Sequence, residues 1–261
     1  MIYLYGFVDS AAEGPAGELG GIDGQAVSLL DMEGLVAVVS RVSDESYSQA
    51  AVELRSKDLT WLAERGASHE RIVTWFVDRG DVVPVPLMTL YSSEDQLRKD
   101  ALDRKQRVLG TFARLGGRRE WDLKVSYDAR RLEENLGDFS QEVAELDRQL
   151  SEASPGRRYL LQRKRDELVR SAVGETARRL ASGIMDTLAD VAEDTVRLPL
   201  PREAADLPVI LRGAFLVRRE DEARLLERLA DRMKGLEDAG IRAELSGPWA
   251  PYRFVEGDNG G

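Results

Sequence analysis

Trp121-Asp122-Leu123-Lys124-Val125-Ser126-Tyr127 is the stretch that decides the fold of this chain. Apolar and polar residues alternate strictly along it, as in a strand with one buried face. Beyond it, apolar residues recur at spacings of four and three, which is typical of a packed helix: Leu132, Leu136, Phe139, Val143, Leu146 and Leu150. Ser154-Pro155-Gly156 breaks this helix, and a second apolar stripe runs from Leu161 to Val191. The strand therefore leads into an antiparallel helical hairpin at about residues 128–192.

The rest of the C-terminal half continues the pattern. Two further strands are predicted, at Val196–Leu200 and Val209–Arg218. An amphipathic helix capped by Gly240 is predicted at residues 220–239, and a last alternating strand at Ile241–Leu245. The order strand, hairpin, strand, strand, helix, strand predicts a ferredoxin-like βαββαβ domain whose first crossover is enlarged.

The N-terminal half mixes strands and helices in an order that matches no named arrangement. Residues 2–8 predict a strand, residues 26–41 a hairpin and residues 48–77 a helix. An extended segment with two prolines covers residues 81–91, and a further helix from about residue 93 stops at Gly116-Gly117.

Two domains and a tail follow from this order. We expect an α+β protein with an N-terminal α+β domain at residues 1–117 and the ferredoxin-like domain at residues 118–255. Residues 256–261 are glycine-rich and polar, which predicts a disordered tail.

Composition excludes several classes of protein. The net charge of −10 argues against a nucleic-acid binder, because polyanions are bound through a basic field. No apolar run is long enough to span a membrane, no signal peptide precedes the first strand, and there is no cysteine, so a cytoplasmic protein without disulfides or membrane contact is expected. Arg157–Arg179 is locally basic, and is either the solvated side of a helix or a docking face for an acidic partner.

Groups suited to catalysis are scarce. His69 is the only histidine and there is no cysteine, which excludes thiolate nucleophiles and multi-histidine metal sites. The glycine-rich stretch Glu13–Gly24 lacks a dinucleotide fingerprint and is interpreted as a flexible surface loop. We therefore expect no catalytic residue, metal or cofactor, and a His69 that is structural or contacts a partner. A hydrolase with paired carboxylates stays open as an alternative.

The segment Gly247-Pro248-Trp249-Ala250-Pro251-Tyr252-Arg253-Phe254 is the strongest candidate for a binding site. Its prolines exclude a helix or a regular central strand. Its aromatic residues either plug the edge of a core or contact a partner. The candidate partner-binding residues are Pro248, Trp249, Tyr252 and Phe254.

Segments along the whole chain resemble the GvpL/GvpF family of gas vesicle proteins. Tyr3-Leu4-Tyr5-Gly6 resembles the opening strand of that family, Arg119–Val125 its E-W-x-x-K-V strand, and Ser154–Leu160 its S-P-G-x-x-Y-L turn. The segment Gly247–Phe254 is the most specific of these matches. Leu87-Met88-Thr89 departs from the family, which usually has Phe-Gly-Thr there.

The resemblance implies a gas vesicle accessory protein that is not an enzyme. It implies a two-domain α+β fold and association with the main gas vesicle shell protein (GvpA-type), which would be kept soluble or delivered to the growing vesicle. One alternative is a minor structural component on the inner surface of the vesicle. Another is a scaffold that binds other gas vesicle accessory proteins through the hairpin at Leu132–Val191.

Overall fold

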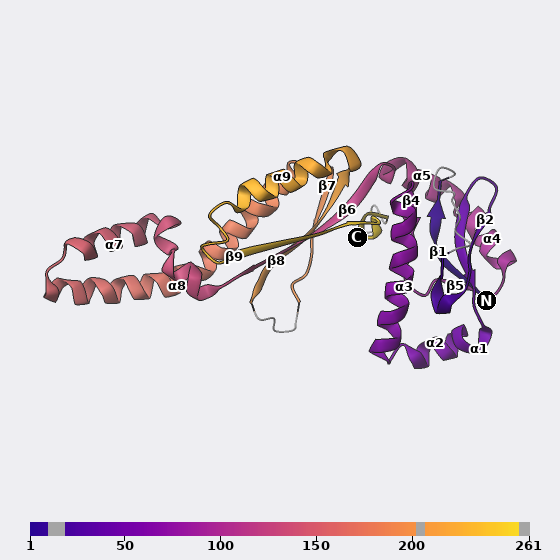
Figure 1. Cartoon of the computed structure of the whole chain (residues 1–261), viewed down its shortest axis with the longest axis horizontal. Helices are drawn as coiled ribbons and strands as arrows, with labels where there is room; N and C mark the ends of the chain where they lie inside the picture. The colour runs from indigo at the N-terminus through magenta and orange to yellow at the C-terminus, as the bar shows by residue number, and fades with distance from the viewer. Residues whose placement is uncertain (10–18, 202–206, 256–261) are drawn as a thin grey trace. The chain divides into compact units, whose positions relative to one another are not determined.

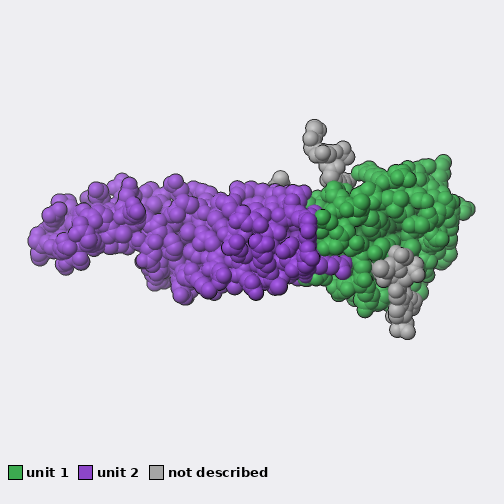
Figure 2. Space-filling view, turned by 90° about the horizontal axis from the view of Figure 1, so that it is seen from above, with its two compact units in different colours: residues 1–120, 248–261 green, residues 121–247 purple. Residues whose placement is uncertain are grey.

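The computed structural model describes residues 1–9, 19–201 and 207–255. They form two compact units, coloured separately in Figure 2: unit 1 holds residues 1–120 together with the segment from Pro248 onward, and unit 2 holds residues 121–247. Unit 2 is thus shorter than the C-terminal domain expected at residues 118–255. The predicted disordered tail and the first part of the glycine-rich loop, residues 10–18, lie outside the described residues.

The fold is α+β, and each unit has its own antiparallel sheet. In unit 1 the strand order is β2-β3-β1-β4, and β5 also pairs with β1. The strands are β1 (Ile2–Val8), β2 (Val27–Asp31), β3 (Val36–Arg41), β4 (Val82–Pro84) and β5 (Leu90–Tyr91).

Strand β1 is central, and its residues are buried on both faces of the sheet. Tyr3 and Tyr5 belong to one core cluster, whereas Leu4 and Phe7 belong to the other. The register against β3 shifts between Leu4 and Gly6, and this bulge returns Phe7 to the face of Leu4. A short strand of seven residues therefore supplies both halves of the core of unit 1.

Helices cover both faces of this sheet, and Figure 1 shows the long helix α3 beside it. Helix α3 packs Ile72, Val73 and Phe76 on the side of Tyr3, and helices α4 and α5 pack Leu97 and other residues on the side of Leu4. The helices of this part are α1 (Asp44–Tyr47), α2 (Gln49–Arg55), α3 (Leu59–Val77), α4 (Glu94–Asp103) and α5 (Lys105–Leu115).

The predicted single helix at residues 48–77 is wrong in one respect, because α2 and α3 are separate. Asp58 caps α3: its carboxylate accepts hydrogen bonds from the backbone N–H groups of Thr60 and Trp61. The predicted helix from residue 93 is likewise divided at Arg104, whose backbone leaves the helical region.

Unit 2 is built around a sheet of order β7-β8-β6-β9, in which β7 and β9 form the two edges. Its core contains Leu123 and Val125 of β6, Phe215 of β8, Ile184 of α8 and Leu225 of α9. The elements are β6 (Arg118–Tyr127), α6 (Ala129–Glu134), a 3-10 turn at Leu136–Asp138, α7 (Gln141–Glu152), α8 (Pro155–Ala189), β7 (Asp194–Arg197), β8 (Val209–Arg218), α9 (Glu222–Met233) and β9 (Ile241–Trp249).

Two predicted helix boundaries in unit 2 are corrected by the structure. The first arm of the hairpin is interrupted, and Ser140 caps the restarted helix α7 by accepting a hydrogen bond from the N–H of Val143. Helix α9 ends at Met233, so Gly240 is not its cap. Gly240 instead has φ +90° just before β9, where a Cβ atom would lie 2.7 Å from that of Arg131.

None of the helices in the described part of the chain combines the length and apolar character needed to cross a bilayer.

Candidate functional site

The four predicted binding residues come from the end of β9 and from a short helix, α10 (Tyr252–Val255). The expectation that the prolines exclude a helix is therefore wrong for the residues after Pro251, since proline is tolerated at the start of a helix. The guanidinium of Arg114 in α5 donates hydrogen bonds to the carbonyl oxygens of Phe254 and Val255. Ala250 is fully buried and belongs to the same core cluster as Tyr3. The segment therefore closes the core of unit 1, which is why residues 248–255 fall outside unit 2.

The structure buries the four residues to different degrees. Phe254 is only 3% exposed, and the hydroxyl oxygen of Tyr252 is buried. Pro248 and Trp249 are partly exposed at the end of edge strand β9. Phe254 thus matches the alternative of a core plug, and partner contact through Pro248, Trp249 and Tyr252 stays a prediction.

An ion pair between a buried carboxylate and a partly exposed guanidinium, which the sequence did not reveal, fixes this segment. Glu120 of β6 is 1% exposed, and its carboxylate pairs with the guanidinium of Arg253. The same carboxylate accepts a hydrogen bond of 3.1 Å from the backbone N–H of Arg253. A buried carboxylate needs such partners, because its desolvation is costly. The only sequence signal was a glutamate directly before the alternating strand at Trp121.

Aromatic rings form a continuous cluster beneath the segment. The ring centroids of Tyr3 and Tyr5 are 4.9 Å apart, and that of His69 lies 5.5 Å from Tyr5 and 6.3 Å from Tyr252. Offset and tilted ring pairs at these distances add to the stability that burial provides. His69 is 3% exposed, which agrees with the structural alternative for this residue.

Two contacts hold the His69 ring in place within the cluster. The Tyr3 hydroxyl oxygen accepts a hydrogen bond from the backbone N–H of Met88, and it lies 2.8 Å from Nδ1 of His69, at hydrogen-bond distance. Burial lowers the pKa of His69 to about 4, so the imidazole is uncharged at neutral pH.

Burial favours the uncharged form of the other titratable groups in the cluster as well. It raises the pKa of the Tyr3, Tyr5 and Tyr252 hydroxyls, and for Tyr252 the neighbouring carboxylate of Glu70 adds to the effect. Burial also raises the pKa of Glu70. These hydroxyls stay protonated, and the cluster serves as a rigid base for the C-terminal segment.

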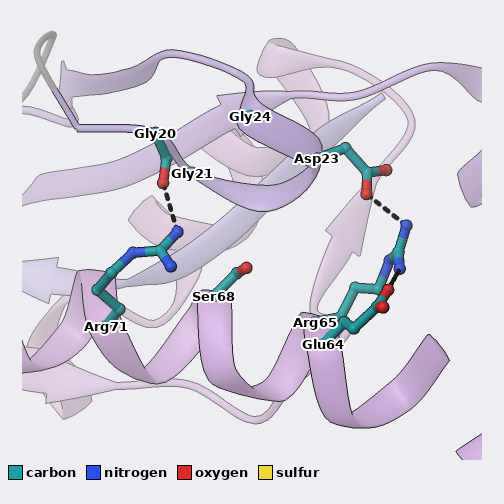
Figure 3. A pocket seen from close by; sticks show the side chains of 8 residues that line it. All are labelled: Gly20, Gly21, Asp23, Gly24, Glu64, Arg65, Ser68 and Arg71. Atoms are coloured by element: carbon teal, nitrogen blue, oxygen red, sulfur yellow. Dashed lines mark hydrogen bonds and ion pairs between the residues drawn. The ribbon is translucent and has the colours of Figure 1, made fainter. Parts of the chain in front are cut away.

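A separate pocket of about 260 Å³ lies between helix α3 and the described part of the glycine-rich loop (Figure 3). Ser68 projects into it between Arg65 and Arg71. The pocket is lined by Gly20, Gly21, Asp23, Gly24, Glu64, Arg65, Ser68 and Arg71.

Both cations of this pocket are held by acceptors of the protein itself. Arg65 pairs with Asp23 at 2.5 Å and with Glu64 at 2.8 Å, and Arg71 donates to the carbonyl oxygen of Gly20 at 2.8 Å. With two carboxylates beside two guanidinium groups, the pocket has no excess of positive charge for a phosphate.

Contacts with the core correct the interpretation of the described part of this loop, residues 19–24, as a flexible surface segment. Ile22 is fully buried, and its backbone N–H donates to the hydroxyl of Tyr5 at 2.8 Å. The Tyr47 hydroxyl donates to Asp23 at 2.8 Å. Leu19 also packs against this core cluster, so residues 19–24 are fixed to the core by two apolar side chains that the surrounding glycines concealed. Across residues 1–9, 19–201 and 207–255, no three His, Asp or Glu side chains converge in a way that could hold a metal ion.

Comparison with known proteins places this chain in a family. The family model described as "Gas vesicle synthesis protein GvpL/GvpF" matches residues 1–256. The chain belongs to the GvpL/GvpF family. The match runs through both units, so it covers the C-terminal segment and the hairpin as well as the two sheets.

Curated relatives of this GvpL/GvpF chain bear the same kind of name. It is 31% identical to gas vesicle protein L of a Streptomyces species over 238 residues, which cover 90% of this chain and 85% of the relative. It is 25% identical to gas vesicle protein L1 of Halobacterium salinarum, with 97% and 89% of the two chains covered.

Solved structures share the fold of the GvpL/GvpF chain. The crystal structure of GvpF from Anabaena superposes with a TM-score of 0.68 at 19% identity, covering 99% of this chain and 97% of that one. GvpF from Microcystis aeruginosa gives a TM-score of 0.65 at 17% identity, with 98% of each chain covered. These likenesses establish a GvpF-like α+β fold.

Proposed function

We propose that this protein is a cytoplasmic, gas vesicle-associated assembly factor that binds the main shell protein (GvpA-type). It keeps that hydrophobic subunit soluble or delivers it to the growing vesicle, and it acts by binding and not by catalysis. Family membership over residues 1–256 supports a role in gas vesicle synthesis. A self-assembling shell subunit exposes apolar surface and strand edges before it joins the wall, and a partner that covers them prevents aggregation.

The observation that carries this proposal is the position of β9 at the edge of its sheet, where no other described strand pairs with it. β9 is the last strand in the sheet order of unit 2, and Arg242, Glu244 and Ser246 along it are exposed. Edge strands recruit an extended segment of a partner through main-chain hydrogen bonds. At the end of this edge, Pro248 and Trp249 offer a partly exposed apolar and aromatic surface.

The arrangement of unit 2 supports the finer description of its fold. We infer a ferredoxin-like βαββαβ unit whose first crossover is the enlarged hairpin of α6, α7 and α8. In such a unit the first strand lies between the third and the fourth, as β6 lies between β8 and β9 in the observed order β7-β8-β6-β9.

The test compares Trp249→Ala with Leu54→Ala in the full-length chain. Leu54 is 70% exposed on α2 and provides a matched loss of apolar surface away from β9. Each variant is co-expressed with the shell subunit, its fold is checked by circular dichroism, and soluble and co-purifying shell subunit is measured. We expect Trp249→Ala to reduce co-purification about tenfold, as loss of an aromatic anchor does at interfaces, and Leu54→Ala to have no effect.

The proposal fails if the wild-type chain leaves the shell subunit in the pellet and forms no complex with it. If the wild type binds the shell subunit and Trp249→Ala binds it equally well, the shell subunit binds elsewhere on the chain. Purified vesicles washed with detergent separate assembly factor from wall component: an assembly factor should be scarce, whereas a fixed ratio to the shell subunit would favour the structural alternative.

A further inference from the structure

The part of α8 from Pro155 to Arg179 carries cations that no described residue neutralises. Between Pro155 and Arg179 there are eight basic and three acidic residues, although the whole chain has a net charge of −10. Arg165 pairs with Asp147, while Arg158 and Arg179 donate to backbone carbonyl oxygens. In the described part of the chain, five basic side chains of this stretch form no ion pair or hydrogen bond: Arg157, Arg163, Lys164, Arg170 and Arg178.

Helix geometry places several of these residues on one face. Helix α7 runs beside the first half of α8 (Figure 1) and covers the side that carries Arg165 and the buried Val169. At about 100° per residue, the opposite side of α8 includes six exposed residues, which we call the outer face: Tyr159, Leu160, Arg163, Glu167, Arg170 and Arg178. The exposed Lys164 and Ser171 border this face.

The outer face has an apolar end and a charged remainder. Tyr159 and Leu160 are adjacent and each 66% exposed. After them the charges follow in the order plus, minus, plus, plus at Arg163, Glu167, Arg170 and Arg178. From Tyr159 to Arg178 the helix rises about 28 Å, which is the length of a partner helix of about 19 residues.

We propose that the outer face binds an acidic amphipathic helix of another protein. Leucine-like side chains at one end of the partner would cover Tyr159 and Leu160. Acidic residues spaced by about seven or eight positions would pair with the three arginines, and one basic residue between the first two would face Glu167. This site lies on the hairpin and goes beyond the binding of a shell subunit at β9.

The charge order favours a protein partner over a polyanion. A nucleic acid or an anionic membrane presents uniform negative charge, which would meet Glu167 between Arg163 and Arg170 and would be repelled by a chain of net charge −10. An amphipathic helix can vary the sign of its charges along its length, and it also offers apolar side chains to Tyr159 and Leu160.

The experiment uses the full chain and a fluorescent synthetic helix of about 21 residues built to this pattern. A second peptide carries glutamate in place of the lysine that faces Glu167. Binding is measured by fluorescence anisotropy for the wild type, for Arg163→Gln/Arg170→Gln, and for the control Arg55→Gln/Lys57→Gln, which removes two exposed cations near α2. We expect the hairpin variant to bind the first peptide at least about fivefold more weakly, and the control to bind it like the wild type.

Reversal of one charge gives a sharper readout. Glu167→Lys should invert the preference between the two peptides, which a merely attractive basic surface would not do. The proposal is overturned if the hairpin variant and the control bind equally, if Glu167→Lys leaves the preference unchanged, or if an RNA duplex or phosphatidylserine vesicles bind more tightly than the first peptide. Shell-subunit binding should be normal in all these variants, so failure here is distinguishable from failure of the proposed function.

Discussion

Lowering the pH should reduce the free energy of unfolding of unit 1, because the buried His69 resists protonation. The unfolded chain protonates this histidine near pH 6.5, whereas burial lowers its pKa in the folded chain to about 4. Above pH 6.5 His69 is uncharged in both states, and the folded state has its full stability. Between pH 6.5 and pH 4 the unfolded state binds a proton that the folded state does not, so the free energy of unfolding falls as the pH is lowered. At pH 5.5 the expected loss is about 1.4 kcal/mol, and the full loss is about 3 kcal/mol.

The chain suits this measurement because His69 is its only histidine. The free energy of unfolding is measured by urea titration at about pH 7.5 and 5.5 for the wild type and for His69→Gln, whose side-chain amide can still form a hydrogen bond with Tyr3. Fluorescence reports chiefly on unit 1, which contains three of the four tryptophans, Trp61, Trp75 and Trp249.

Carboxylates, including Glu70, titrate in both proteins and cancel in the difference. The variant should start from a lower stability but lose about 1.4 kcal/mol less between the two pH values. Equal losses in the two proteins would refute the assignment of a buried, uncharged His69.

Two further substitutions test the core of unit 1 by urea titration. Phe254→Ala should lower the free energy of unfolding by about 3–5 kcal/mol, because it leaves a cavity in a buried site. Trp249→Ala should lower it by less than about half as much, and similar losses for the two variants would show that the segment is not a core plug. Gly6→Ala should cost about 1–3 kcal/mol, because its Cβ would lie 2.7 Å from the carbonyl oxygen of Val83. Gly110→Ala, with open space in α5, is its control and should be neutral or stabilising.

Strands with a clear period were predictable from the sequence. Val209–Arg218 has the predicted bounds, and the alternation from Trp121 to Tyr127 lies within the longer β6. Interruptions of helices were not predictable from periodicity, because the apolar spacing continues across them. Asp58 and Ser140 cap new helices, but each residue is also compatible with a continuous solvent-exposed face until its hydrogen bonds are seen.

The candidate site was predicted as a segment but not as a set of contacts. Prolines and aromatics distinguished residues 247–254, yet they could not decide which rings are buried. That depends on Glu120, 133 residues away in sequence from Arg253. Local patterns carry no information about such a long-range partner, and a charged residue in a strand is usually exposed.

The return of the chain to unit 1 after residue 247 affects how the protein is made. On the ribosome, nearly the whole polypeptide must emerge before Ala250 and Phe254 can fill the core begun by the first strand. Unit 2 can fold first, while the core of unit 1 is still incomplete. A fragment that stops near residue 117 should therefore keep a permanent opening and require added C-terminal peptide to become fully folded.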